Sequence, residues 1–246
     1  MESSIKVGIS SCVLGERVRF DSGHKISNFV TKELDGYFSF VPVCPEVGVG
    51  MSVPRPTIRL VSNEERIALV ETKNPDNDHT DNMLAYSENK VNELQGEQLC
   101  GYIVCAKSPT CGMERVKVYS KNNAAKEGVG LYTKTLMEKM PWLPVEEDGR
   151  LNDPVLKENF ITRVYCLNDF YESMDGDPTR GKIIEFHSRY KLTLMAHHPE
   201  SYRSLGRLVA PLTLIKHYLN AYPDAYLQKQ KYLEPYPQEM RLRYGL

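Results

Sequence analysis

Residues Lys6-Val7-Gly8-Ile9-Ser10-Ser11-Cys12-Val13-Leu14-Gly15 form an apolar strand pattern that runs into a polar turn and a cysteine. Two later apolar runs end in a similar way, at Cys44-Pro45-Glu46-Val47-Gly48 and at Lys107-Ser108-Pro109-Thr110-Cys111-Gly112. In an open α/β sheet the strand ends meet at one crevice, where ligands usually bind. The pattern therefore predicts an α/β fold that brings three cysteines together at such a crevice.

The rest of the chain divides into two parts. Residues 58–61 and 66–70 predict a hairpin, and residues 82–99 and 129–140 predict helices. Residues 141–149, with two prolines and an acidic turn, predict a linker. Helical spacing dominates after it. We therefore expect an α/β domain over residues 1–148, an open sheet with flanking helices, and a small all-α domain over residues 149–246.

Three thiols at one crevice could hold a metal centre with one coordination position left open. Soft thiolates select iron–sulfur clusters, zinc or copper(I). The paired Cys-x-x-Cys spacing of a structural zinc site is not present in the sequence. A small buried side chain is the alternative for each cysteine. Cys100 and Cys166 fit that structural role, and Cys105 is the least clear of the three remaining thiols.

Two polar residues stand beside these cysteines. Glu46 lies two positions after Cys44, where a carboxylate could deprotonate a water. Ser108 lies three positions before Cys111, where its hydroxyl could bond a substrate heteroatom. A surface glutamate and an ordinary Ser-Pro turn are the alternatives.

Three charged residues could bind the substrate. Lys107 precedes Ser108 and could steady anionic charge. Arg19 and Asp21 belong to a loop, residues 17–25, in which charged, aromatic and glycine residues alternate close to Cys12. A solvated lysine and a solvated turn remain the alternatives.

The C-terminal part is more basic than the rest. Residues 150–246 hold 14 Lys and Arg against 11 Asp and Glu, whereas the whole chain has a net charge of −1. Basic residues interleaved with tyrosines suit a phosphate backbone and unpaired bases, although a solvated basic face is an equally simple explanation. The candidate RNA-binding residues are Arg180, Arg189, Lys191, Arg203 and Arg207.

The sequence also indicates a location. It starts without a basic segment followed by a long apolar core, and no apolar run approaches the roughly 20 residues that span a membrane. We therefore expect a cytoplasmic protein with no membrane partner, in which six cysteines serve as ligands, catalysts or core residues rather than in disulfides.

Four separated motifs resemble those of the TudS-type thiouracil desulfidases. They are residues 9–15, 18–23, 44–47 and 107–112. Residues 186–192 and 205–209 resemble a helical domain often fused to it, as in the RudS enzymes that act on 4-thiouridine in tRNA. The resemblance implies a 4Fe–4S cluster held by Cys12, Cys44 and Cys111 with one open iron, and a catalytic pair, Glu46 and Ser108.

The resemblance implies a hydrolytic, non-redox desulfidase. The open iron would act as a Lewis acid on the thiocarbonyl sulfur, Glu46 would activate a water, and Ser108 would hold a ring or leaving-group atom. The expected substrate is tRNA containing 4-thiouridine, which becomes uridine. The alternatives are a desulfidase of free thiouracil or thionucleosides with a structural C-terminal domain, a cluster-based sensor or nucleic-acid binder without catalysis, and a catalytic zinc site.

Two positions depart from the pattern of this family. Ala210 runs directly into Pro211, where the helical domain of the family has several tens of additional residues. If the additional segment grips RNA, its loss places tRNA binding in question but leaves the desulfidase domain intact. Cys105 stands where a longer polar residue is expected. The oligomeric state has no signal in the sequence.

Overall fold

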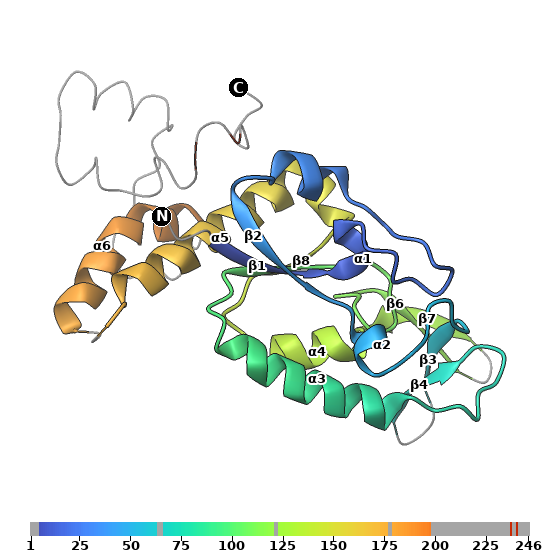
Figure 1. Ribbon diagram of the computed structural model, residues 1–246. Coiled ribbons are helices and arrows are strands. Elements are labelled where there is room, and N and C mark those ends of the chain that lie inside the picture. Colours follow the sequence, from blue (N-terminus) through green and yellow to red (C-terminus); the bar gives the residue numbers. More distant parts are fainter. Residues whose placement is uncertain are drawn as a thin grey trace. The chain divides into compact units, whose positions relative to one another are not determined.

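The computed structural model describes residues 5–62, 66–120, 123–176 and 179–197, together with Pro237 and Met240. Its first sheet contains β1 (Ile5–Ser10), β2 (Phe38–Val43), β5 (Gly101–Val104) and β8 (Val145–Glu147). The strand order is β2-β1-β5-β8, and all neighbouring pairs are parallel. The α/β prediction is thereby confirmed, and the carboxyl ends of β1, β2 and β5 lie side by side (Figure 1).

Helices cover both faces of this sheet. Successive side chains of a strand point to opposite faces. Tyr102 of β5 contacts Tyr132 of α4 (Leu131–Lys139), their hydroxyls 3.1 Å apart, and α4 packs beside α3 (Thr80–Gln95). Gly101 faces the first half of α5 (Pro154–Ser173), so closely that a Cβ at this position would lie 2.7 Å from the Val164 side chain. The two predicted helices at residues 82–99 and 129–140 are confirmed as α3 and α4.

A second sheet was not expected from the sequence, which indicated a single open sheet. It contains β3 (Ile58–Ser62), β4 (Ile67–Glu71), β6 (Val116–Tyr119) and β7 (Ala124–Gly128), in the order β4-β3-β6-β7. The predicted hairpin at residues 58–70 is confirmed as β3 and β4. Apolar side chains from this sheet pack with α3 and α4 in one buried cluster: Leu60, Leu69, Met83, Val116, Val118 and Leu131.

The prediction of a linker at residues 141–149 is wrong. This segment contains β8, which pairs with β5, and Glu146, Glu147 and Asp148 are all buried. Their carboxylates have partners, because Arg150 donates to Glu146 over 2.7 Å and the Met113 N–H donates to Glu147 over 2.9 Å. Prolines and acidic residues are typical of loops, but these acidic side chains are bound inside the fold.

Short helical segments connect the strands. They are α1 (Ser11–Leu14) after β1, the π-helix η1 (Phe29–Glu33), α2 (Pro45–Gly48) after β2, and the 3-10 helix η2 (Arg150–Asn152) after β8.

The chain divides into two compact units between Val164 and Tyr165. The described part of the second unit contains the end of α5 and α6 (Arg180–His197), in agreement with the helical prediction. Helices expected near residues 211 and 224 lie outside the described residues. Among the helices of the described residues, none is both long and apolar enough to cross a bilayer.

Candidate active site

The ends of three neighbouring strands deliver three thiols to one edge of the first sheet. Cys12 lies in α1 directly after β1, Cys44 follows the last residue of β2, and Cys105 follows the last residue of β5. Because these strands are parallel and adjacent, their carboxyl ends share one edge. The sequence pattern predicts Cys12 and Cys44 at this edge but does not assign Cys105 to it.

The fourth thiol, Cys111, belongs to the loop that follows β5. Two of its neighbours hold this loop: the Cys111 N–H donates to Ser108 Oγ over 3.1 Å, and Thr133 Oγ1 donates to the Cys111 carbonyl over 2.7 Å. Burial raises the pKa of the Cys111 thiol, and the charge of Glu46 raises it further. Cys111 therefore lies close to the predicted catalytic carboxylate.

The thiols at this edge influence one another. A hydrogen bond with Cys105, and then burial, raise the pKa of Cys12. The same hydrogen bond lowers the pKa of Cys105; burial opposes this shift, and the charges of Lys25 and Arg19 support it. Burial raises the pKa of Cys44, while a backbone N–H at Val47 acts in the opposite direction. Bringing these sulfurs together as thiolates thus requires a compensating cation.

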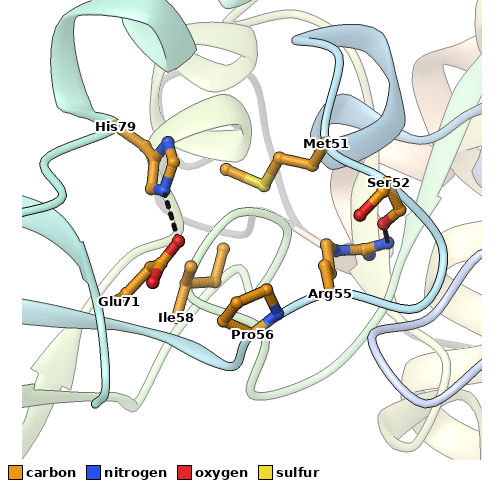
Figure 2. Close-up of a pocket in the computed structure, with 7 residues that line it drawn as sticks. All are labelled: Met51, Ser52, Arg55, Pro56, Ile58, Glu71 and His79. Carbon is orange, nitrogen blue, oxygen red and sulfur yellow. Dashed lines mark hydrogen bonds and ion pairs between the residues drawn. The ribbon is translucent and has the colours of Figure 1, made fainter. Parts of the chain in front are cut away.

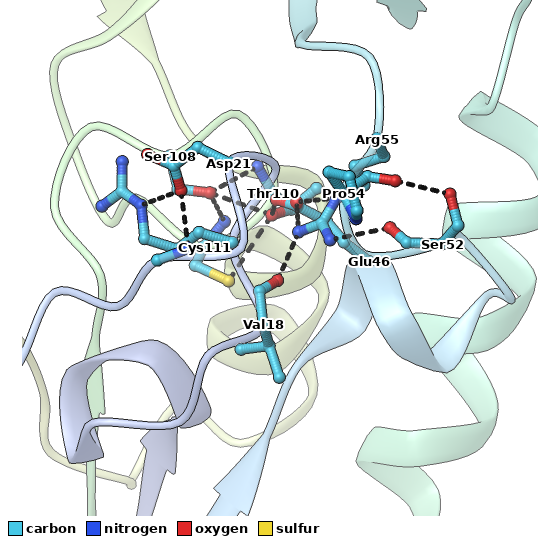
Figure 3. A network of polar contacts seen from close by, with 11 residues as sticks. Val18, Asp21, Glu46, Ser52, Pro54, Arg55, Ser108, Thr110 and Cys111 are labelled. Atoms are coloured by element: carbon cyan, nitrogen blue, oxygen red, sulfur yellow. Dashed lines mark hydrogen bonds and ion pairs between the residues drawn. The ribbon is translucent and has the colours of Figure 1, made fainter.

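Glu46 is fixed through both of its carboxylate oxygens. Arg55 donates to Oε2 from Nε over 2.9 Å and also from Nη2, and Thr110 Oγ1 donates to Oε1 over 2.7 Å (Figure 3). The Arg55 side chain is only 4% exposed, and its remaining N–H groups donate to the carbonyls of Val18 and Ser52. The carboxylate is therefore held in one position by charge and by a buried hydroxyl.

Ser108 is joined to the same network. Its Oγ lies 2.9 Å from Thr110 Oγ1 and accepts the N–H groups of Thr110 and Cys111 over 3.2 and 3.1 Å. The structure thus brings Glu46 of α2 and Ser108 of the loop after β5 to the same hydroxyl (Figure 3).

The three predicted substrate-binding residues lie at different places. Lys107 is exposed and has a positive φ of 64°. Arg19 is partly buried, forms an ion pair with Asp21 at 3.9 Å, and lowers the pKa of Cys105 by its charge. Asp21 is exposed and also accepts the Gly23 N–H over 3.0 Å. Arg19 thus acts on a thiol of this edge by its charge, and substrate binding by all three residues stays a prediction.

Sequence reasoning missed several residues that shape this site. Arg55 lies in an irregular segment without a motif, and Thr110 lay unremarked between Ser108 and Cys111. Lys25 and Asp148 form an ion pair at 2.9 Å, and Asp148 also accepts the Ala106 N–H over 2.8 Å. This pair carried no usable signal either, because Lys25 lies in a predicted loop and Asp148 in the predicted linker.

A small cavity of about 140 Å³ adjoins the site through Arg55 (Figure 2). Its wall also contains an ion pair in which His79 Nε2 lies 3.6 Å from Glu71 Oε1. The remaining lining residues are Met51, Ser52, Pro56 and Ile58. Arg55 therefore separates this cavity from the carboxylate of Glu46.

The predicted RNA-binding residues are only partly described. Arg180 begins α6, and Lys191 is a partly buried residue of the same helix. Arg189 lies 3.4 Å from Asp169 and donates to Ser173 within the second unit. Arg203 and Arg207 lie outside the described residues. RNA binding by these residues stays a prediction, and Arg189 has an intramolecular partner.

The donor set at the strand ends fits a thiolate-bound metal centre. No group of three or more His, Cys, Asp or Glu side chains, in the part of the chain that the structure describes, is placed to hold one metal ion. An iron–sulfur cluster differs from a single ion, since each thiolate binds its own iron. All six cysteines are described and none forms a disulfide, so Cys12, Cys44 and Cys111 remain available as predicted ligands.

Comparisons with known proteins match the two parts of the chain separately. A family model described as 2-thiouracil desulfurase matches residues 7–148, and one described as a protein of unknown function, DUF1722, matches residues 207–237. The uncharacterized protein YbgA of Escherichia coli (strain K12) is 23% identical over an alignment of 159 positions, which covers 94% of that protein and 36% of this chain. Because 36% of 246 residues is fewer than 159, part of YbgA has no counterpart here.

One solved structure is also similar to this chain. It is described as a [4Fe-4S]-dependent thiouracil desulfidase, TudS, and is 24% identical with a TM-score of 0.49. The match covers 63% of this chain and 97% of that chain.

Proposed function

Because the chain belongs to the 2-thiouracil desulfurase family, we propose that it hydrolyses the thiocarbonyl group of a thiolated pyrimidine and releases the sulfur as hydrosulfide. The preferred substrate in this proposal is 4-thiouridine in tRNA. The observation that carries the proposal is the position of Glu46, whose two oxygens are held by Arg55 and Thr110 beside a cluster of thiols.

Cys12, Cys44 and Cys111 would hold a 4Fe–4S cluster in this proposal. Soft thiolates suit such a cluster, and three of them leave one iron without a protein ligand. When bound, the cluster supplies a Lewis-acidic iron that draws electrons from the thiocarbonyl group. The neighbouring thiols, Cys105 first, raise the pKa of Cys12, and a cationic centre would favour its thiolate.

Glu46 is the general base in the proposed reaction. A carboxylate acts well as a base when its geometry is fixed within reach of the water it deprotonates. Arg55 and Thr110 provide that fixed geometry without occupying every lone pair of the two oxygens. Glu46 keeps 16% of its side-chain surface exposed, so a water can reach it.

Ser108 would contact the substrate or the departing sulfur. Its oxygen accepts two backbone N–H groups, and such donors stabilise negative charge on a serine oxygen. The side chain is partly exposed, whereas Thr110 beside it is fully buried. Ser108 can therefore meet a ligand while Thr110 cannot.

The C-terminal part supplies the argument for tRNA. Its basic excess would hold phosphates while the thiolated base reaches the crevice, which requires local unstacking at a cost of a few kcal/mol. Lys191→Glu combined with Arg207→Glu should weaken tRNA binding and flatten its salt dependence. Unchanged tRNA binding by that variant would contradict this placement.

A free thiobase or thionucleoside is the second candidate substrate. One observation favours it: Arg189, a predicted RNA contact, is engaged by Asp169 and Ser173 inside its own unit. If the substrate is a free thiobase or thionucleoside, the C-terminal part has a structural role only.

The first experiment measures sulfide release by protein purified without oxygen. The substrates are tRNA carrying 4-thiouridine, free 4-thiouridine and free thiouracil, and the visible absorption distinguishes an iron–sulfur cluster from colourless zinc. Release from tRNA supports the preferred substrate, and release from the free compounds alone supports the second. No release from any of them, by protein with a full cluster, overturns the proposal.

Two variants separate cluster binding from chemistry. Glu46→Gln should keep the visible absorption and lower turnover by about 10² or more, since it removes a general base. Cys12→Ala should lose both the absorption and the activity. A Glu46→Gln protein with wild-type turnover would remove Glu46 from the mechanism.

A further inference from the structure

The Thr110 hydroxyl connects the two predicted catalytic groups. It lies 2.7 Å from Glu46 Oε1 and 2.9 Å from Ser108 Oγ. The Thr110 side chain is fully buried, while Glu46 and Ser108 at its two sides are partly exposed. This row of three hydrogen-bonded groups thus has two accessible ends, Glu46 and Ser108, and a buried middle, Thr110, from which solvent is excluded.

The direction of these hydrogen bonds follows from the chemistry of the groups. An ionised carboxylate only accepts, so the Thr110 hydroxyl must donate to Glu46. Ser108 Oγ already accepts two backbone N–H groups, which fill both lone pairs of a serine hydroxyl. Ser108 must therefore donate its own proton to Thr110, and the resting order is Ser108 to Thr110 to Glu46.

We propose that Thr110 is a positioning residue that relays a proton from Glu46 to Ser108, so that Ser108 becomes a proton donor only after Glu46 has accepted one. This inference rests on the proposed desulfidase function and deepens it. In the resting state the Ser108 proton is directed at Thr110 and away from any substrate. Protonation of Glu46 reverses the direction of these hydrogen bonds, because the carboxylic acid then donates to Thr110 and Thr110 donates to Ser108.

The proton balance closes with this relay. The overall reaction converts a thiocarbonyl and water into a carbonyl, hydrosulfide and one proton, with no electrons transferred. Water gives one proton to Glu46 as its oxygen bonds to the ring carbon. The carbon–sulfur bond then breaks, Ser108 protonates the departing sulfur, and Thr110 passes the proton of Glu46 to Ser108. The second water proton leaves to solvent when the carbonyl forms.

The backbone contacts at Ser108 support this order. A serine oxygen that gives up its proton has three lone pairs, which the N–H groups of Thr110 and Cys111 and the Thr110 hydroxyl can fill. The transient negative charge is thus met by donors that are already in place. A Thr110 side chain with a merely structural role would not need both catalytic groups as partners.

The test compares Thr110→Val, which keeps the shape but lacks the hydroxyl, with Thr110→Ser, which keeps the hydroxyl. Thr162→Val on α5 is the matched control, because Thr162 is also a buried threonine and its hydroxyl has no hydrogen-bond partner among the residues that the structure describes. The readouts are iron content, visible absorption, kcat and KM of the full-length holoenzyme with the substrate that the wild type desulfurates.

Thr110→Val should lower kcat by about 10² and leave KM close to that of the wild type, since Thr110 does not touch the substrate. Thr110→Ser, which keeps the hydroxyl, should recover most of the kcat that Thr110→Val loses, and Thr162→Val should stay near wild-type kcat. In a Ser108→Ala background, Thr110→Val should cost much less than in the wild type, because the relay is already lost and only the Thr110 contact with Glu46 remains to be removed. Thr110→Val with a full cluster and wild-type kcat overturns the relay, as does a full additional loss in the Ser108→Ala background.

A measurement on the wild type covers the case in which Thr110→Val loses its cluster, since Thr110 Oγ1 lies 3.5 Å from Cys111 Sγ. Single-turnover rates in mixtures of light and heavy water should depend on the deuterium fraction along a curve, because more than one proton moves. A straight line overturns the relay while leaving the desulfidase function intact. A wild type that releases no sulfide overturns the proposed function, and the relay with it.

Discussion

Arg55 belongs to no sequence motif, yet four of its hydrogen bonds organise the site. Two reach Glu46 Oε2, one reaches the Val18 carbonyl and one the Ser52 carbonyl. A planar guanidinium with five N–H groups can serve several acceptors at once, which an ammonium cannot. Arg55 thus ties its own segment to α2 and to the loop that holds Val18.

Replacement of Arg55 should therefore affect stability and turnover together. Arg55→Gln leaves Glu46 without its charge partner in a nearly buried position, so we expect the free energy of unfolding to fall by about 3 kcal/mol and kcat to fall as well. Arg55→Lys should lose less, because the charge remains. Urea unfolding and sulfide release measure the two effects.

Arg59→Gln on β3 is the control for this prediction. The Arg59 guanidinium lies over the Tyr119 ring at 5.1 Å, an interaction of about 0.5–1 kcal/mol. Equal losses for Arg55→Gln and Arg59→Gln would contradict the special role of Arg55.

The sequence predicted individual site residues where a strand end or a motif marked them. Cys12, Cys44 and Ser108 were found in this way, because parallel strand ends must share one edge. Arg55 and Thr110 were not, because a contact between residues nine or 64 positions apart leaves no local pattern. Which side chains complete a network is decided by the fold of the loops.

Elements were predicted well where periodicity was long and poorly where it was short. The helices α3 and α4 follow from their apolar spacing, whereas β8 has three residues and an acidic sequence that suggests a loop. The position of so short a strand is fixed by its pairing with β5 and by the hydrogen bonds of its carboxylates. Such partners cannot be inferred before the fold is known.

The start of α3 depends on a carboxylate just before it. Asp78 Oδ1 accepts the N–H of Thr80, the first residue of α3, over 2.8 Å, and Oδ2 accepts from Arg66. Thr80 Oγ1 in turn accepts the Leu69 N–H of β4 over 2.8 Å. Burial opposes ionisation of Asp78, but the hydrogen bonds from Thr80 and the charge of Arg66 outweigh it and lower its pKa.

Asp78→Ala should reduce the free energy of unfolding by about 1 kcal/mol at neutral pH, as for other helix-start residues. Because the folded pKa lies below the unfolded value of about 3.9, the stabilisation is present above that value and is lost as the pH falls through the folded pKa. Wild type and variant should thus converge at acid pH. Unfolding curves between neutral and acid pH test this, with Asp76→Ala on the same turn as control. A difference that grows on acidification would contradict the assignment.

At the scale of the whole chain, the sequence placed the domain boundary after residue 148, and that boundary stays a prediction. The compact units divide 16 residues later, between Val164 and Tyr165. The first half of α5 explains the difference, because Phe160 and Val164 pack against Gly101 of β5 and Ile161 is fully buried. Helical spacing predicted this helix but did not predict that its first half packs against β5.

Two fragments distinguish these boundaries. Fragment 1–148 lacks Phe160, Ile161 and Val164, each of which contributes about 1.5–3 kcal/mol when buried, so about 4.5–9 kcal/mol in all. Since domains of this size are stable by about 5–15 kcal/mol, the fragment should be largely unfolded or unfold at low urea. Fragment 1–173 keeps the whole of α5 and should unfold cooperatively and retain the visible absorption of the bound cluster. Equal stability of the two fragments would instead support the boundary at residue 148 and make α5 dispensable to the first sheet.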